Sequence, residues 1–132
     1  MQSVLDFIYE PERPCRDVLV YLHELLTGTY GLQPVLRYRI PFYDQHSWVC
    51  YLNPVGKKGV EIAFIKGNEL SNSQGMLDFR GRKQVAGIII EEIRDVRQGI
   101  LDEIILESLW IDEQQNKLKR GNRDESFDQW AS

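Results

Sequence analysis

The sequence predicts an α+β fold in which a mainly antiparallel, four-stranded meander packs in two layers against an N-terminal helix and a long C-terminal helix. Three observations carry this prediction. Apolar segments with strand-like patterns follow one another between residues 35 and 90, a helical apolar spacing precedes them, and a longer helical spacing follows them. Consecutive strands flanked by helices are typical of α+β domains.

The 132 residues correspond to a single domain, which we expect to cover 1–120 and to be followed by a polar, flexible tail over 121–132. Hydrophobic residues make up 42% of the chain, enough for a core that needs no disulfide or metal. Cys15 and Cys50 are isolated and are expected to be reduced thiols. No signal-peptide pattern or membrane-length apolar run is present, which predicts a cytoplasmic protein without membrane contact.

The N-terminal segment predicts a short helical turn over residues 3–9 and then a helix over 15–27. Pro14 suits the first turn of that helix, where a backbone N–H is not needed. An apolar stripe runs along it at helical spacing, and Gly28 offers a stop. His23 falls opposite the stripe, so we expect a solvated surface histidine.

Four strands are predicted over residues 35–40, 48–52, 60–65 and 85–90. Pro41 ends the first strand or places it at a sheet edge, and a hairpin at 55–59 joins the second and third strands. The segment 66–84 between the last two strands is too long for a plain hairpin. Long ordered loops often serve function, and cations beside exposed glycine backbone can hold an anion.

The last element is a helix predicted over residues 95–119. One apolar stripe on it is expected to pack on the sheet: Ile93, Val96, Ile100, Leu101, Ile104, Ile111 and Leu118. Leu106, Leu109 and Trp110 project roughly from the opposite side. Either the N-terminal segment or the tail covers this second group, or the group forms a homodimer interface.

Cations and aromatic side chains on the strands and their loops form the main candidate ligand site. The candidates are Arg37, Tyr38, Arg39, Phe42, Tyr43, Lys66, Arg80, Arg82 and Lys83. Arginine forks suit a carboxylate or phosphate group, and aromatic rings supply flat walls. The simpler alternative is that these cations only solubilise loops and strand edges.

Catalytic and metal-binding patterns are scarce. No nucleophile lies at a recognisable spacing from a base, which favours a non-catalytic protein. Carboxylates at the start of the last helix form an alternative metal site for iron, although a charged outer helix face is the common reason for such residues: Glu91, Glu92, Asp95, Asp102 and Glu103. The net charge of −4 and the absence of a base-reading helix argue against nucleic acid as a partner.

Two segments resemble the YdhG-like family, a bacterial domain of unknown function. Residues 36–43 (LRYRIPFY) are similar to the family's strand that ends in an aromatic-flanked proline, and residues 63–70 (AFIKGNEL) are similar to its strand and lysine–glycine turn. The similarity extends over roughly residues 4–115. The chain departs from the family pattern at Ser71–Asn72, in the single-glycine basic run of 79–83, and at Val85–Ala86, so a shared ligand site does not carry over.

The resemblance implies a compact α+β domain packed by terminal helices, and some relatives carry an iron-chaperone, frataxin-like label. The residues themselves favour a non-catalytic domain that binds a small ligand or anion, with no cofactor. Iron binding at the acidic helix face and a protein-interaction or dimerisation role remain the alternatives.

Overall fold

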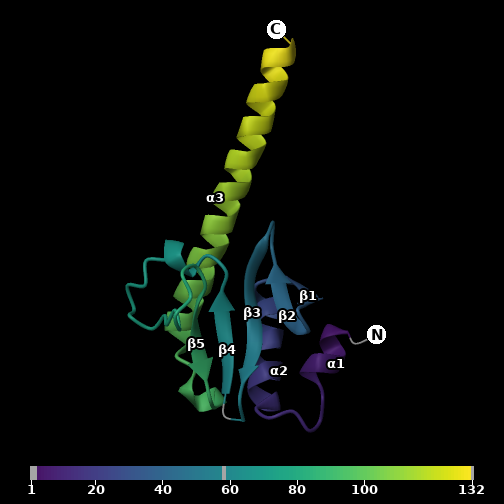
Figure 1. Cartoon of the computed structure of the whole chain (residues 1–132), viewed down its shortest axis with the longest axis vertical. Coiled ribbons are helices and arrows are strands. Elements are labelled where there is room, and N and C mark those ends of the chain that lie inside the picture. Colours follow the sequence, from purple (N-terminus) through teal and green to yellow (C-terminus); the bar gives the residue numbers. More distant parts are fainter. Residues whose placement is uncertain (1–2, 58, 132) are drawn as a thin grey trace.

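The structure is a computed structural model that describes the backbone of residues 3–57 and 59–131, and the side chains of 3–57 and 59–121. A five-stranded antiparallel meander, in the order β1-β2-β3-β4-β5, forms its centre. The strands are β1 (Gln33–Arg37), β2 (Ile40–Asp44), β3 (Trp48–Val55), β4 (Gly59–Phe64) and β5 (Ala86–Ile90). The helices α1 (Val4–Ile8) and α2 (Arg16–Glu24) precede the sheet, and α3 (Gln98–Ala131) follows it (Figure 1).

Helices cover only one face of the sheet. Alternate strand residues such as Tyr43, Leu52 and Ile62 are buried and join one core with Leu22 of α2 and Ile104 of α3. In Figure 1 the strands accordingly lie in front of α2 and α3. The intervening residues of each strand point to the other face, which no helix covers. The predicted α+β class is confirmed.

The predicted count of four strands is wrong, because the segment predicted as one strand turns back on itself. Tyr38 and Arg39 have φ values of 51° and 65° and form a two-residue turn between the paired residues Arg37 and Ile40. Such left-handed turns match the twist of a β-hairpin, although non-glycine residues adopt them infrequently. Pro41, predicted to end a strand, instead lies inside β2 opposite Leu36 of β1.

The N-terminal helices begin and end close to the predicted residues. Ser3 and Asp6 form a reciprocal capping box at α1, and a π-helical turn over Leu25–Thr29 extends α2. The expectation for His23 is wrong, since only 6% of this residue is exposed. Its Nδ1 lies 2.8 Å from the Tyr43 hydroxyl of β2, and burial lowers the pKa of His23.

The loop between β4 and β5 is fastened to the sheet at several points. Asp78 and Gly87 exchange two backbone hydrogen bonds of 2.9 Å each. Gly67 approaches Ala86 so closely that a Cβ at position 67 would lie 2.5 Å from the Ala86 nitrogen. The loop is therefore an ordered part of the domain.

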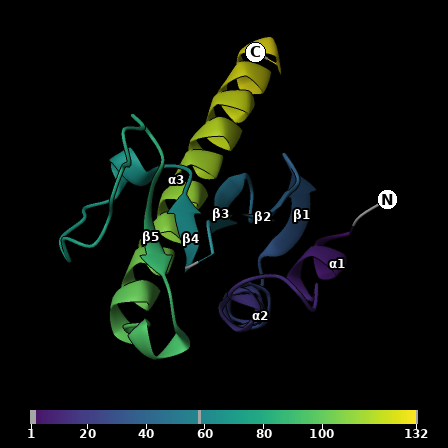
Figure 2. The same cartoon turned by 60° about the horizontal axis from the view of Figure 1, so that its bottom comes forward.

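Helix α3 is longer than predicted and extends beyond the end of the sheet. It starts at Gln98, after a 3-10 turn over Ile93–Asp95, and its backbone continues to Ala131. Leu101, Ile104 and Ile111 pack on the sheet as expected, whereas Leu118 is exposed because the helix has passed the sheet by then (Figures 1 and 2). The tail proposed for 121–132 is thus helical in its backbone to Ala131, while its side chains from 122 onward and Ser132 lie outside the described residues.

Within the described residues, no helix combines the length and the apolar character needed to cross a bilayer. Both cysteines are free thiols: Cys50 is buried in β3, and Cys15 is half-buried just before α2.

Candidate functional site

The face of the sheet that no helix covers carries a buried carboxylate that the sequence analysis did not single out. Glu61 lies in the middle of β4 and has 0% of its surface exposed. Arg82 of the long loop donates to both of its oxygens at 2.5 and 3.1 Å, and Arg80 donates at 3.1 Å. Arg82 also donates to the Tyr51 hydroxyl at 3.0 Å. We call these four residues the Glu61 cluster.

The Glu61 cluster sets two guanidinium groups against one carboxylate, and both oxygens of that carboxylate accept hydrogen bonds from arginine. The hydrogen bond from Arg82 to Glu61 raises the pKa of the guanidinium, so Arg82 keeps its charge. Gly87 of β5 leaves the space that this arrangement needs, because a Cβ there would lie 2.7 Å from Glu61 Oε2. Arg80 and Arg82, proposed as ligands for an external anion, therefore already hold an anion of the protein.

Beside this cluster, aromatic rings extend over the same face toward β1. Phe42, Trp48 and Tyr51 are in contact, with ring centroids 5.0–5.3 Å apart, and Tyr38 at the hairpin turn lies 5.9 Å from Phe42. Arg37 stacks 4.3 Å above the Trp48 ring and forms a two-pronged ion pair with Asp44 at 2.6 and 2.7 Å. The charge of Arg37 is therefore paired with a carboxylate of the same chain, Asp44.

The remaining predicted ligand residues lie apart from this face. Tyr43 points to the helix-covered side, where burial raises its pKa. Arg39 is in the β1–β2 turn, and Lys83 is exposed on the long loop. Lys66 follows β4 at the end of the sheet that α3 passes. The predicted set is consequently spread over both faces of the sheet, two loops and the end of β4, and is not gathered in one concavity.

A polar pocket surrounds Lys66 where the β2–β3 turn, the end of β4 and α3 meet. We call it the Lys66 pocket, and it is lined by His46, Ser47, Lys66, Asp112, Gln115, Asn116 and Lys119. The start of β3 and the end of β4 fall at the same end of the sheet because the two strands are antiparallel. Helix α3 crosses that end and supplies every third or fourth residue to the pocket.

Asp112 anchors the β2–β3 turn to α3. Its carboxylate accepts hydrogen bonds from Gln45 Nε2 and from the His46 backbone N–H, both at 2.9 Å, and from the Ser47 hydroxyl. Burial by itself would raise the pKa of Asp112, but these three bonds and the nearby positive Lys66 together hold the pKa below its ordinary value. Asp112 is therefore an ionised and fully bonded structural group.

On the other side of the pocket, donors outnumber acceptors. Lys66 Nζ donates to the Gln115 side-chain oxygen, and Gln115 in turn donates to Glu69 at 2.8 Å. The buried Asn116 Nδ2 has no hydrogen-bond partner in the described part of the chain. Lys119 forms no ion pair with any described carboxylate. These groups favour an acceptor, such as a water oxygen or an anion.

The Lys66 pocket opens into a wider cleft. The pocket itself encloses about 20 Å³, which is enough for a single water or the oxygen of an acid group. The adjoining cleft of about 380 Å³ shares Ser47, Lys66, Gln115 and Lys119 with it, and adds Trp48 and Ile65. This cleft is shallow and widely open to solvent, so it would cover only one side of a ligand.

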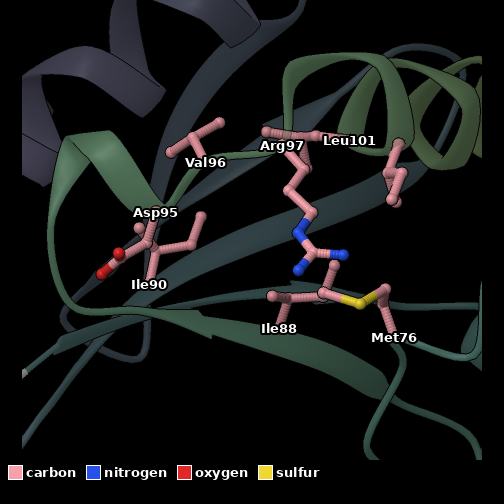
Figure 3. A pocket seen from close by; sticks show the side chains of 8 residues that line it. Met76, Ile88, Ile90, Asp95, Val96, Arg97 and Leu101 are labelled. Carbon is pink, nitrogen blue, oxygen red and sulfur yellow. The ribbon is translucent and has the colours of Figure 1, made fainter.

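A second cavity, between β5 and the start of α3, is almost entirely apolar (Figure 3). Ile88, Ile90 and Leu101 line it together with Met76 of the long loop, and its volume is about 30 Å³. The side chain of Arg97 extends across it toward Ile88 and Met76. Asp95 and Arg97 are the polar residues of its lining, and with so little free volume this cavity offers few of the convergent polar contacts that orient a ligand.

The carboxylates proposed as an iron site do not converge. Asp102 accepts hydrogen bonds from Tyr30 and Gln98, Glu103 accepts one from Gln74, and Glu92 pairs with Arg94. Burial, followed by the bond to Asp102, raises the pKa of Tyr30 to about 12. Glu91 and Asp95 are exposed. Among the described residues no three histidine, cysteine, aspartate or glutamate side chains are grouped to hold a metal ion.

Sequence reasoning identified Lys66 but missed Asp112, Asn116 and Glu61. Glu61 does carry a signal, because it is the one charged residue inside the apolar run of residues 60–65. Asp112 and Asn116 lie in a polar stretch of α3, and no local pattern distinguishes them from solvated residues.

Comparison of the chain with protein-family models, curated proteins and solved structures gave no match. The resemblance to the YdhG-like family therefore stays a prediction that rests on the two segments at 36–43 and 63–70.

Proposed function

We propose that this protein is a non-catalytic binding domain for a small organic anion, with the acid group of the ligand in the Lys66 pocket. The observation that carries the proposal is the buried, unpaired Asn116 Nδ2 beside Lys66 and Lys119. An unpaired buried donor costs about 1–3 kcal/mol, and an acceptor that reaches it recovers that cost. An anionic acceptor gains further from the two ammonium groups.

The surroundings of the Lys66 pocket favour an acid attached to a flat apolar body. Trp48 and Ile65 form the apolar part of the adjoining cleft, and Trp48 is held in place by Phe42 and Arg37. A planar group stacked on Trp48 would bury apolar surface while its acid group reached the donors. Asp112 repels such a ligand only weakly. Its carboxylate oxygens accept three hydrogen bonds from the β2–β3 turn, and the positive charge of Lys66 nearby offsets its negative charge.

Thermal unfolding with three probes tests the proposal: inorganic phosphate, benzoate, and benzamide as the neutral analogue of benzoate. We expect benzoate to raise the melting temperature and benzamide to leave it unchanged. A ligand at about 100 times its Kd stabilises the folded state by about 2.7 kcal/mol. Stabilisation by phosphate but not benzoate would assign the pocket to inorganic anions and contradict the role of the Trp48 cleft.

Three variants locate the binding site. Lys66→Met and Asn116→Leu are expected to abolish the benzoate shift, because each removes a donor that the acid group needs. Lys83→Met is the matched control, since Lys83 belongs to the predicted ligand set but is exposed on the long loop. A shift that survives in Lys66→Met and disappears in Lys83→Met would move the site to the loop and overturn the proposal. No shift with any anion would reject anion binding, and leave a water molecule as the occupant.

A further inference from the structure

The part of α3 that extends beyond the sheet has no covering in the described part of the chain. Every residue from Lys117 to Gly121 is exposed, so no face of the helix is packed there. Both views show α3 continuing past the sheet as a single rod (Figures 1 and 2). Short helical segments in water are marginal unless an apolar face is packed against something. A partner for α3 is therefore physically reasonable.

The outward side of α3 carries large apolar residues near its middle. Trp110 and Leu106 are 62% and 56% exposed, and they lie on the side of the helix opposite Ile104 and Ile111, which pack on the sheet. Leu109, which the sequence analysis grouped with them, instead packs against the core. The residues on this outward side are spaced at about one or two helical turns, with Glu113 and Gln114 between Trp110 and Lys117: Gly99, Glu103, Leu106, Trp110, Lys117 and Gly121.

One pair of opposite charges on this side is placed symmetrically about Trp110, and the nearby Glu113 is already paired with His46. Glu103 lies seven positions before Trp110 (110 − 103) and Lys117 seven positions after it (117 − 110). Gly99 and Gly121 lie eleven positions before and after (110 − 99 and 121 − 110). A Cβ at either glycine would meet nothing within 4 Å, so packing within the domain does not require glycine at these positions.

We infer that α3 forms an antiparallel homodimer, in which a two-fold axis passes at Trp110 and Glu103 of each copy meets Lys117 of the other. Two rings of Trp110 then meet at the axis, where an aromatic anchor is most effective. The glycines at both ends let the helices approach closely. Parallel pairing would instead oppose Glu103 to Glu103 and Lys117 to Lys117, which the charges disfavour.

This interface leaves the Lys66 pocket accessible. Asp112, Gln115, Asn116 and Lys119 lie on the inward side of α3, away from the stripe of Glu103, Trp110 and Lys117. The dimer therefore stands or falls independently of the anion-binding proposal.

Sedimentation velocity over a concentration series, with charge-swap variants, tests the dimer. Glu103→Lys and Lys117→Glu are each expected to weaken association about tenfold, because two symmetric attractions become repulsions. The double variant is expected to recover the wild-type dissociation constant. Glu12→Lys and Lys83→Glu change the net charge equally at exposed positions away from α3 and serve as matched controls. Circular dichroism melts show whether each variant is folded.

The outcomes separate the arrangements. Weakened single variants with a restored double variant support the antiparallel pairing. A wild-type protein that remains monomeric at its highest soluble concentration would overturn the dimer. A dimer that neither single variant weakens would overturn the Glu103–Lys117 register, and a Trp110→Lys variant that dimerises normally would exclude α3 as the interface.

Discussion

The Glu61 cluster and the Lys66 pocket each join charged side chains from segments distant in the sequence, but they differ in how completely these groups are paired. Both carboxylate oxygens of Glu61 accept hydrogen bonds from arginine side chains. One of these arginines, Arg82, also donates to the Tyr51 hydroxyl. In the Lys66 pocket the carboxylate of Asp112 is equally well bonded, yet Asn116 Nδ2 has no partner and Lys119 no described counter-ion. A carboxylate whose oxygens are all bonded stabilises the fold, whereas the unpaired donors of the Lys66 pocket are the basis of the proposed anion site.

The largest effect is expected where the closed cluster is broken. Arg82→Met should lower the free energy of unfolding by about 3 kcal/mol, because it leaves the buried Glu61 carboxylate with the single hydrogen bond from Arg80. Arg80→Met should cost only about 1 kcal/mol, since Arg80 supplies a single bond and is more exposed. Urea denaturation of both variants measures the difference. Equal losses would show that the two arginines share Glu61 evenly, contrary to the geometry.

Filling the space beside Glu61 tests the same cluster without removing a charge. Gly87→Ala is expected to cost about 2 kcal/mol, because the new methyl group would meet Glu61 Oε2 and the Ile62 carbonyl, both at 2.7 Å. Gly28→Ala is the control, since a Cβ there meets nothing within 4 Å. If Gly87→Ala proves as stable as the control, Glu61 is less tightly enclosed than the structure indicates.

Asp112 links the pocket to acid stability. Because its folded pKa lies below the ordinary value of 3.8, the unfolded chain binds the proton first as the pH falls. The stability that Asp112 contributes is thus complete above that ordinary value and is lost as the pH falls through the folded pKa. Asp112→Asn should cost about 1.5 kcal/mol at neutral pH, and its unfolding free energy should fall less steeply in acid.

Urea denaturation at a series of pH values checks the Asp112 prediction. The slopes of the wild type and of the variant should differ only in the acid range. Identical acid slopes would mean that the hydrogen bonds from Gln45, His46 and Ser47 do not lower the pKa.

The smallest effect is expected at the unpaired donor. Asn116→Leu should raise the free energy of unfolding by about 1 kcal/mol, because it removes an unpaired buried donor and loses no hydrogen bond. The contrast with Arg82→Met sharpens the distinction between a closed cluster and an open pocket. A loss above about 1 kcal/mol would show that Asn116 has a bonded partner, such as an ordered water, in the free protein.

The fold class could be predicted from the sequence because apolar periodicity depends on local geometry. The strands at 48–52, 60–65 and 85–90 and the helix at 15–27 all lie close to the observed elements. The β1–β2 hairpin could not be predicted, because its turn uses Tyr38 and Arg39 at positive φ in place of glycine or asparagine. The tertiary structure stabilises this turn through the ring contacts of Tyr38 with Phe42 and Trp48.

By itself, the sequence determined the α+β class, the succession of helices, strands and a last helix, and the presence of many cations on the predicted strands and their loops. Only the tertiary structure decided which of those cations are free. Arg37, Arg80 and Arg82 pair with Asp44 and Glu61, whereas Lys66 lies beside an unpaired donor. The physical reason is that residue periodicity reports burial within one element, but charge pairing depends on distances of a few ångströms between elements far apart in the chain.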